Sequence, residues 1–170
     1  MAKNNGKLTS IMMGFLKSDC TKCSSQISMT FKRSLTETEI ADLFRKTISD
    51  FPSFQEEDFL CRYARKLSSN ASFVVTYDKE DNIVAMVAAY INNPPLCYIS
   101  HVSVLDVYKR NGLFSRMLAL LEKKAKLVNC SIIKLEVKEK NLPAIAAYKK
   151  NGFEIDCMAS EDSVYMKKLL

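Results

Sequence analysis

The sequence predicts a single domain of the α/β (α+β) class, in which a mixed sheet is covered by helices on both faces. Its length of 170 residues is that of one ordinary domain. Hydrophobic residues make up 48% of the chain and charged residues 26%, which excludes the collagen-like, disordered and coiled-coil classes. Helical and strand periodicities alternate along the chain, and this interleaving favours a mixed sheet between helical layers.

We expect the chain to divide into an N-terminal arm, residues 1–24, and one domain, residues 25–170. The arm is rich in Ser, Lys and Asn around one short apolar patch, which indicates a flexible arm or a short accessory helix. No apolar run approaches the ~18 residues that a membrane span needs. The patch is also shorter than the ~7–15 residues of a signal-peptide core, so the expected location is cytoplasmic.

Apolar spacing and capping residues predict the order of elements within the domain. Thr36 and Glu39 have the spacing of a capping box and start the first helix. Asn141 is expected to cap the last helix and Gly152 to end it. The predicted helices begin near residues 36, 55, 112 and 141, and the predicted strands cover residues 27–33, 72–77, 83–91, 96–104, 131–137, 153–158 and 163–169.

The same periodicity predicts which side chains are buried. Phe59 falls on the apolar face of the second helix, and Val128 on the apolar stripe of the third. Residues 131–137 form a nearly continuous apolar run, which is typical of a central strand buried on both faces.

Charge and cysteine content limit the classes of partner. The net charge is +6, from 25 Lys and Arg against 19 Asp and Glu, and such an excess suits an anionic ligand. The six cysteines are expected to be free thiols in a cytoplasmic chain. Cys20 and Cys23 have the spacing of half a zinc site, but no second pair accompanies them and the one histidine, His101, is distant in sequence. We therefore predict no metal site.

The stretch most informative about chemistry is residues 102–115, a strand followed by a short basic loop and a long amphipathic helix. Such a turn aims unpaired backbone N–H groups and the positive end of the helix at one point, which is an anion site. Lys109 and Arg110 add charge there, and Gly112 lets the backbone turn tightly. A diphosphate would suit this site, although an ordinary strand–helix turn with two solvated cations remains the alternative interpretation.

Two blocks of the sequence resemble the GNAT superfamily of acyl-CoA-dependent N-acyltransferases. The first is the family's Arg/Gln-x-x-Gly-x-Gly/Ala signature after a strand end, whose three positions are occupied here by Lys109, Gly112 and Phe114. The second is an L-x-V strand followed by N-x-x-A-x-x-x-Y-x-x-x-G-F, matched by Leu135, Val137, Asn141, Ala144, Tyr148, Gly152 and Phe153. The resemblance covers about residues 72–170. Two positions depart from the pattern, because Lys109 lacks the planar fork of arginine and Phe114 replaces a small residue.

The resemblance implies a GNAT fold, with a mostly antiparallel twisted sheet whose central strands splay apart, and acetyl-CoA as the co-substrate. Its pantetheine arm would add to the sheet like an extra strand. The backbone of Val102, Ser103 and Val104 would hold that arm, near Asn141, Ala144 and Tyr148. The pyrophosphate would be held by the amides of Lys109, Arg110, Asn111, Gly112, Leu113, Phe114 and Ser115. Tyr148 is where the family places the general acid that protonates the departing thiolate.

The general base is less clearly indicated. Tyr98 shares strand parity with Val102 and Val104, whereas His101 points to the opposite face unless a bulge intervenes near Ser100. If His101 accepts the amine proton, activity should rise through an apparent pKa near ~6.5. If it does not, Tyr98 with an ordered water becomes the candidate. Glu136 is interpreted as a solvated or paired surface carboxylate.

The expected function is transfer of an acetyl group from acetyl-CoA to a primary amine by direct attack in a ternary complex. The acceptor, a small molecule or a peptide, is not identified by the sequence, and both a monomer and a homodimer fit. One alternative is a CoA-binding regulatory module that has lost catalysis. Another is a nucleic-acid-binding domain that uses Lys123, Lys124, Lys126 and Lys134, but the aromatic residues of single-strand binders are missing around them.

Overall fold

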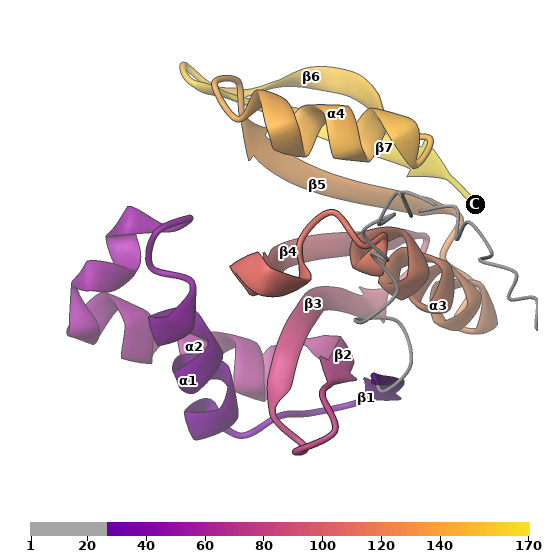
Figure 1. Cartoon of the computed structure of the whole chain (residues 1–170). Coiled ribbons are helices and arrows are strands. Elements are labelled where there is room, and N and C mark those ends of the chain that lie inside the picture. The colour runs from indigo at the N-terminus through magenta and orange to yellow at the C-terminus, as the bar shows by residue number, and fades with distance from the viewer. Residues whose placement is uncertain (1–26) are drawn as a thin grey trace, which may run out of the picture.

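A computed structural model describes residues 27–170, so the predicted arm and the Cys20–Cys23 pair lie outside the described residues. Figure 1 shows the elements in their predicted order, with two short 3₁₀ helices added. The strands are β1 (Ser28–Lys32), β2 (Ser72–Tyr77), β3 (Ile83–Asn93), β4 (Leu96–Val104), β5 (Ile132–Lys138), β6 (Glu154–Ser160) and β7 (Ser163–Leu169). The helices are α1 (Glu37–Lys46), η1 (Pro52–Gln55), α2 (Glu57–Asn70), η2 (Asp106–Tyr108), α3 (Leu113–Leu127) and α4 (Leu142–Lys150).

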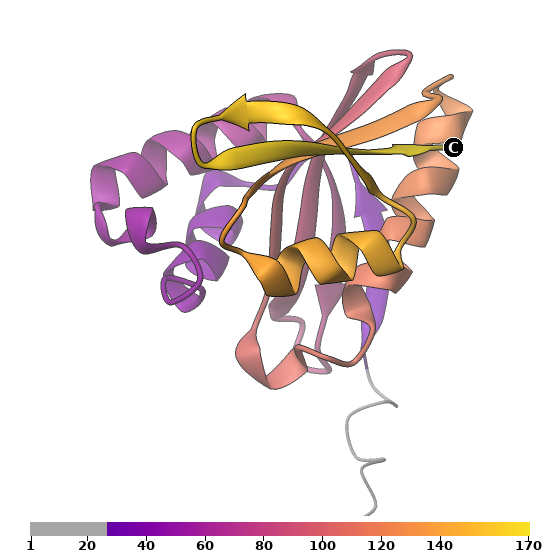
Figure 2. The same ribbon diagram turned by 90° about the horizontal axis from the view of Figure 1, so that it is seen from above.

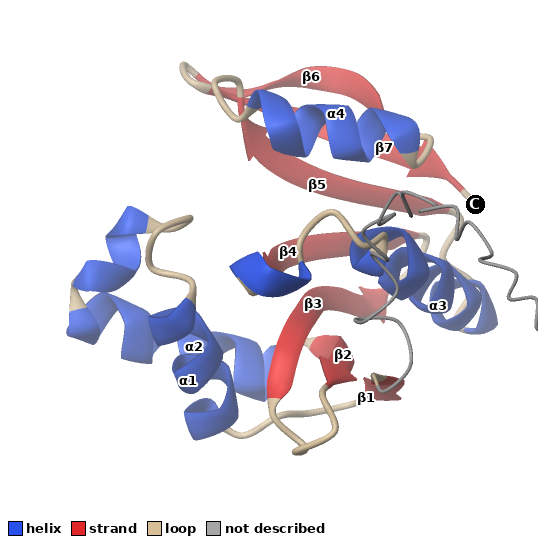
Figure 3. Ribbon diagram, viewed as in Figure 1, coloured by secondary structure: helices blue, strands red, loops and turns tan. Residues whose placement is uncertain are grey.

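The strands form one mixed sheet in the order β1-β2-β3-β4-β5-β7-β6. All neighbours are antiparallel except β4 and β5, which run parallel. Figures 2 and 3 show α1 and α2 on one side of this sheet and α3 on the other. The predicted α/β class, with helices on both faces, is confirmed.

The layer of α1 and α2 covers the first half of the sheet. Thr36 and Glu39 form the predicted capping box, with each side chain bonding the other residue's backbone N–H. Phe44 and Leu60 are fully buried in the core cluster between these helices and strands β2 and β3. The prediction for Phe59 was wrong, since its side chain is 36% exposed at the rim of the aromatic cluster, and Ala64 is buried instead.

Helix α3 packs on the opposite face through Leu113, Met117, Leu118 and Leu121. Val128 was predicted to continue this apolar stripe, but the helix ends at Leu127 and Val128 is exposed. The buried stripe therefore ends at Ala125, one turn earlier than the sequence indicates.

Strand β5 is buried on one face only, which corrects the expectation of a strand buried on both. Ile133, Leu135 and Val137 point into the core beside α3, whereas Glu136 is exposed and Lys134 is only half buried. The physical reason is that α1 and α2, the helices on the other face, bury residues of β2 and β3 and none of β5. The pairing of β5 with β4 is also limited. Their ladder begins at Leu96 with Ile132 and ends at Ile99 with Leu135, and both strands continue beyond it. The predicted splay between the central strands is confirmed, and Figure 1 shows β4 and β5 diverging.

A bulge in β4 lies where the two strands part. Ala89 pairs with Ile99 while the next residue back on β3, Ala88, pairs with His101, so Ser100 has no partner in the β3 ladder. The extra residue reverses the side-chain alternation along β4. Val102 consequently packs toward α3, and His101 lies on the face covered by α1 and α2.

Candidate functional site

The loop before α3 forms an open cradle of backbone N–H groups. Arg110 and Gly112 both adopt left-handed φ values, +63° and +70°. Within the described residues, the amides from Arg110 to Ser115 donate to no acceptor, and the first bonded amide is that of Arg116. A Cβ built on Gly112 would have no neighbour within 4 Å, so the space above this turn is free. Six successive unpaired donors at a helix start can hold an anion such as a phosphate.

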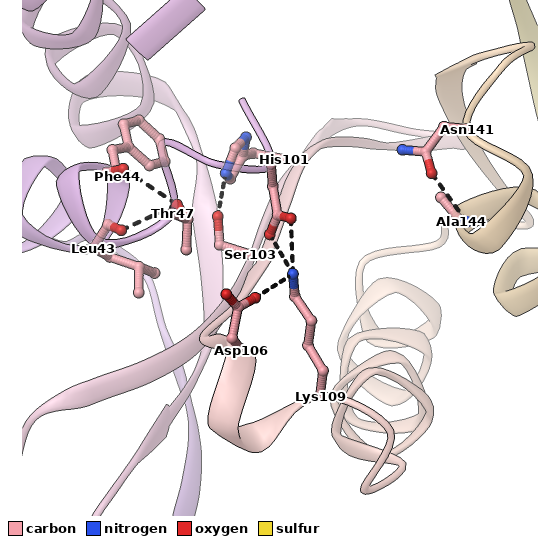
Figure 4. Close-up of polar contacts among 10 residues, drawn as sticks. Leu43, Phe44, Thr47, His101, Ser103, Asp106, Lys109, Asn141 and Ala144 are labelled. Carbon is pink, nitrogen blue, oxygen red and sulfur yellow. Dashed lines mark hydrogen bonds and ion pairs between the residues drawn. The ribbon is translucent and has the colours of Figure 1, made fainter. Parts of the chain in front are cut away.

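Lys109 does not supply a free cation to this cradle, contrary to the expectation from its place in the loop. Its ammonium lies 2.6–2.7 Å from both carboxylate oxygens of Asp50 and 2.7 Å from Asp106. Figure 4 shows the contact with Asp106. Its own backbone N–H bonds the Asp106 carbonyl. Lys109 therefore joins the cradle loop to the segment after α1, and Arg110 is the remaining cation of the loop.

The Phe114 ring turns toward the core and not over the cradle. It packs against the cluster under α3 and meets the Tyr148 ring edge to face, with the centroids 5.3 Å apart. The core thus accommodates the phenylalanine ring where the family has a small residue. The backbone N–H of Phe114 stays available to bind an anion in the cradle. Burial raises the pKa of Tyr148 to about 12, so its phenol stays protonated at neutral pH.

Helix α4 follows the end of β5 in the chain, and its Tyr148 ring meets Phe114 in the first turn of α3. The Asn141 side chain caps it by accepting from the Ala144 N–H at 3.2 Å, as Figure 4 shows. Gly152 follows its end with a φ of +86°, which confirms the predicted C-terminal stop. No residue of α4 is fully buried, so one side of this helix is free to border a ligand.

A pocket of about 330 Å³ lies on the other face of the sheet, where β4 and β5 part. Its lining comes from α2, β4, β5 and β7, and consists of Tyr63, Tyr98, Ile99, Ser100, Glu136, Val137, Lys138 and Ser163. The Tyr63 hydroxyl donates to the Ser100 carbonyl at 2.9 Å and so fixes the bulge to α2. Burial, and then the nearby Glu136 charge, raise the pKa of Tyr98 to about 12.

Glu136 contributes the one carboxylate in the pocket lining. The hydroxyl of Ser163, which is fully buried, donates to its Oε1 atom and leaves Oε2 free to meet a ligand. Glu136 was interpreted as a solvated or paired surface carboxylate; it is exposed as expected, and the structure adds that it lines the pocket. The available signal was its alternation with Leu135 and Val137, which puts it on the face opposite the core, beside the splay.

His101 lies next to this pocket on the same face as Tyr98, because the bulge at Ser100 is present. It is only 6% exposed and is enclosed by the rings of Phe44, Phe51, Phe54 and Tyr63, at centroid distances of 4.6–5.9 Å. Its Nε2 atom bonds the Ser103 hydroxyl (Figure 4). Burial lowers the pKa of His101 to about 3, so the expected activity limb near ~6.5 does not belong to this residue.

The buried imidazole makes folding stability depend on pH. The unfolded chain binds a proton at its single histidine below about pH 6.5, while the folded chain does so only near pH 3. Stability is therefore lost as the pH falls through this window, and between pH 7.5 and 5.5 the free energy of unfolding should drop by about 1.4 kcal/mol. Urea unfolding of the wild type and of His101→Gln at both pH values measures the difference.

The single histidine also gives one imidazole signal by NMR, which should not titrate between pH 8 and 5. A signal that titrates near ~6.5 would contradict the buried, neutral state of His101, whatever the stability of the variant.

Comparison with known proteins identifies the family. The sequence profile of the acetyltransferase (GNAT) family matches residues 37–153, which is more than half of the chain. The chain belongs to this family, and it is an acyltransferase by class. The resemblance of the two sequence blocks is thereby confirmed, as is the fold that it implies. No curated protein sequence matches the chain.

Solved structures show the same fold at low sequence identity. PH1933 from Pyrococcus horikoshii OT3 is 20% identical with a TM-score of 0.71, over 84% of this chain and 99% of that chain. The PaiA N-acetyltransferase from Thermoplasma acidophilum, in complex with coenzyme A, is 14% identical with a TM-score of 0.67, over 84% and 99%. Nourseothricin acetyltransferase is 20% identical with a TM-score of 0.54, and the match covers 59% of this chain and 65% of that chain.

The described residues contain neither a candidate metal site nor a candidate membrane-spanning helix. Among residues 27–170, no group of three or more His, Cys, Asp and Glu side chains is placed to hold a metal ion. In the same part of the chain, no helix has the length and apolar character needed to cross a bilayer.

Proposed function

We propose that this enzyme transfers an acetyl group from acetyl-CoA to a primary amine by direct attack in a ternary complex. The observation that carries the proposal is the free edge of β4 from Ser100 to Val104. This edge begins at the pocket and ends beside the amide cradle, so one extended ligand could reach both. A pantetheine arm can pair with such an edge as an added strand.

Each part of acetyl-CoA has a matching feature on this chain. The backbone of Val102, Ser103 and Val104 would bond the pantetheine arm, because the ladder with β5 ends at Ile99 and leaves this edge of β4 unpaired. The amides from Arg110 to Ser115 would hold the pyrophosphate, with the charge of Arg110 in support. Asn141, Ala144 and Tyr148 on α4 would border the arm from the other side.

The acid and base roles fall to groups on opposite sides of the splay. Glu136 would accept the proton of the attacking amine, in place of His101, which is enclosed and too weakly basic. Tyr98, which shares the pocket with Glu136, would place the amine or a bridging water. As the C–S bond breaks, Tyr148 would give its phenolic proton to the thiolate. The new amide bond and the free thiol account for all atoms.

The test is an acceptor screen that follows free-thiol release from acetyl-CoA across a panel of primary amines. Ternary-complex transfer predicts intersecting initial-velocity lines, whereas parallel lines would indicate a covalent acyl-enzyme. Tight CoA binding without turnover on any amine would instead favour the regulatory module. Nucleic-acid binding has less support from the structure, because Lys134 is paired with Asp156 and Lys124 lies over the Phe31 ring.

Gly112→Asp is expected to weaken CoA binding by at least ~10-fold, since it places a carboxylate where phosphate oxygens approach. Gly112→Asn is the matched control, because asparagine has the same shape and tolerates the left-handed φ without adding charge. Calorimetry with CoA compares the two variants. If Gly112→Asp binds CoA as tightly as Gly112→Asn does, the pyrophosphate lies elsewhere.

A further inference from the structure

We infer that the acceptor is a primary amine with no carboxylate near the reacting nitrogen, so that simple amines are preferred to the corresponding amino acids. This inference rests on the proposed function and names the chemical class of acceptor within it. The charges around the pocket between β4 and β5 carry it.

Glu136 is the charge that the pocket offers to a ligand. Its carboxylate is held from one side by the buried Ser163 hydroxyl, and no Lys or Arg side chain in the described part of the chain forms an ion pair with it. An ammonium group would supply the missing counter-charge.

The cations near Glu136 are already neutralised by carboxylates of their own. Lys138 lines the pocket, but its ammonium bonds both oxygens of Asp162, at 2.6 and 2.8 Å. Lys134 shares the face with Glu136 and is directed away from the pocket, over the Tyr165 ring on β7 and toward Asp156 on β6 at 2.9 Å. A carboxylate on the acceptor would therefore find no free cation among these residues.

The remaining walls are neutral. Tyr63 and Tyr98 present aromatic rings and phenols that stay protonated, because burial raises the pKa of each. The Tyr63 hydroxyl is already bonded to Ser100. An acceptor carboxylate would therefore meet neutral hydroxyl donors such as Tyr98 and no positive charge. At about 330 Å³ the pocket is at the small end of ligand sites, so a carboxylate on the carbon next to the amine would lie close to Glu136. Repulsion between two carboxylates in such a site costs affinity.

The test uses three probes that share the phenylethylamine skeleton: 2-phenylethylamine, and the equally sized pair phenylalanine and phenylalaninamide. Wild-type kcat/KM should be at least ~10-fold higher for the amine and the amide than for the amino acid. The amide is included because it keeps a carbonyl beside the amine while removing the negative charge. Calorimetric titration of the CoA-loaded protein with the same probes measures the preference without turnover.

Asp162→Asn supplies the decisive variant, because it frees the Lys138 ammonium to meet a carboxylate. It should lower the discrimination against phenylalanine several-fold while leaving the amine largely unaffected. Glu161→Gln is the matched control, since it removes the same charge from the same turn and keeps the Lys138–Asp162 pair.

The outcomes separate this inference from the proposed function. Acetylation of phenylalanine as efficiently as of 2-phenylethylamine would overturn the inference and leave the acetyltransferase proposal standing. Thiol release with none of the three probes would count against the proposed function. The binding titration would then test separately whether the pocket prefers the amine to the amino acid. Equal binding of the amine and the amino acid, or binding of neither, would overturn the inference there also.

Discussion

Replacing Glu136 by Gln is expected to lower turnover by ~10²–10⁴-fold, the range typical of one acid–base group. The amide has the same shape and can still accept from Ser163, so the fold and the pocket should survive. It cannot accept the proton of the amine, and a protonated amine has no lone pair with which to attack a thioester. Steady-state kinetics with saturating acetyl-CoA measure the loss, and calorimetry should show CoA affinity unchanged.

Glu139→Gln is the control for this variant, because it neutralises an exposed carboxylate just beyond β5, outside the pocket lining. It should retain the wild-type rate. Unchanged turnover in Glu136→Gln would assign the proton transfer to a water held by Tyr98, and Tyr98→Phe would then carry the loss.

Replacing Tyr148 by Phe is expected to reduce turnover by a similar ~10²–10⁴-fold while CoA binding is retained. The ring contacts with Phe114 and Phe153 persist in the variant, so only the proton donor is lost. Because the pKa of Tyr148 is about 12, the phenol is protonated throughout the working range. The ratio of wild-type to variant rate should consequently stay constant between pH 6 and 9.

Tyr77→Phe provides the comparison, since it removes a phenol hydroxyl from β2, far along the sheet from α4. Its rate should match that of the wild type. A Tyr148→Phe enzyme with normal turnover would make Tyr148 a packing residue and thiolate release a step that needs no acid.

Local signals predicted most of the fold. The capping box at Thr36, the cap at Asn141 and the turn at Gly152 depend on neighbours a few residues away, and all three are as expected. The chain order of strands and helices was likewise present in the apolar periodicity. The sequence also indicated the cradle, because an anion site at a helix start is built from one continuous segment.

The parts of the site that the sequence did not indicate depend on distant contacts. The bulge at Ser100 is fixed by Tyr63, 37 residues earlier in the chain, and it alone determines the face on which His101 lies. Lys109 is paired with Asp50, 59 residues away, and with Asp106, three residues before it, so only part of its neutralisation has a local signal. Glu136 became visible as a pocket residue only once β4 and β5 were known to part after Ile99.

The short ladder between β4 and β5 has a consequence for the protein as a whole. Within residues 27–170, the backbone seam between the part of the sheet formed by β1 to β4 and the part formed by β5, β7 and β6 is short: four ladder pairs, together with the bonds of the Ser131 and Ile132 amides to the Pro95 carbonyl. An acyl-pantetheine arm seated against the free edge of β4 would supply further rungs at the gap where that seam ends. The co-substrate would then be a transient structural member of the sheet, and by mass action its concentration would help to set how firmly the two parts hold together.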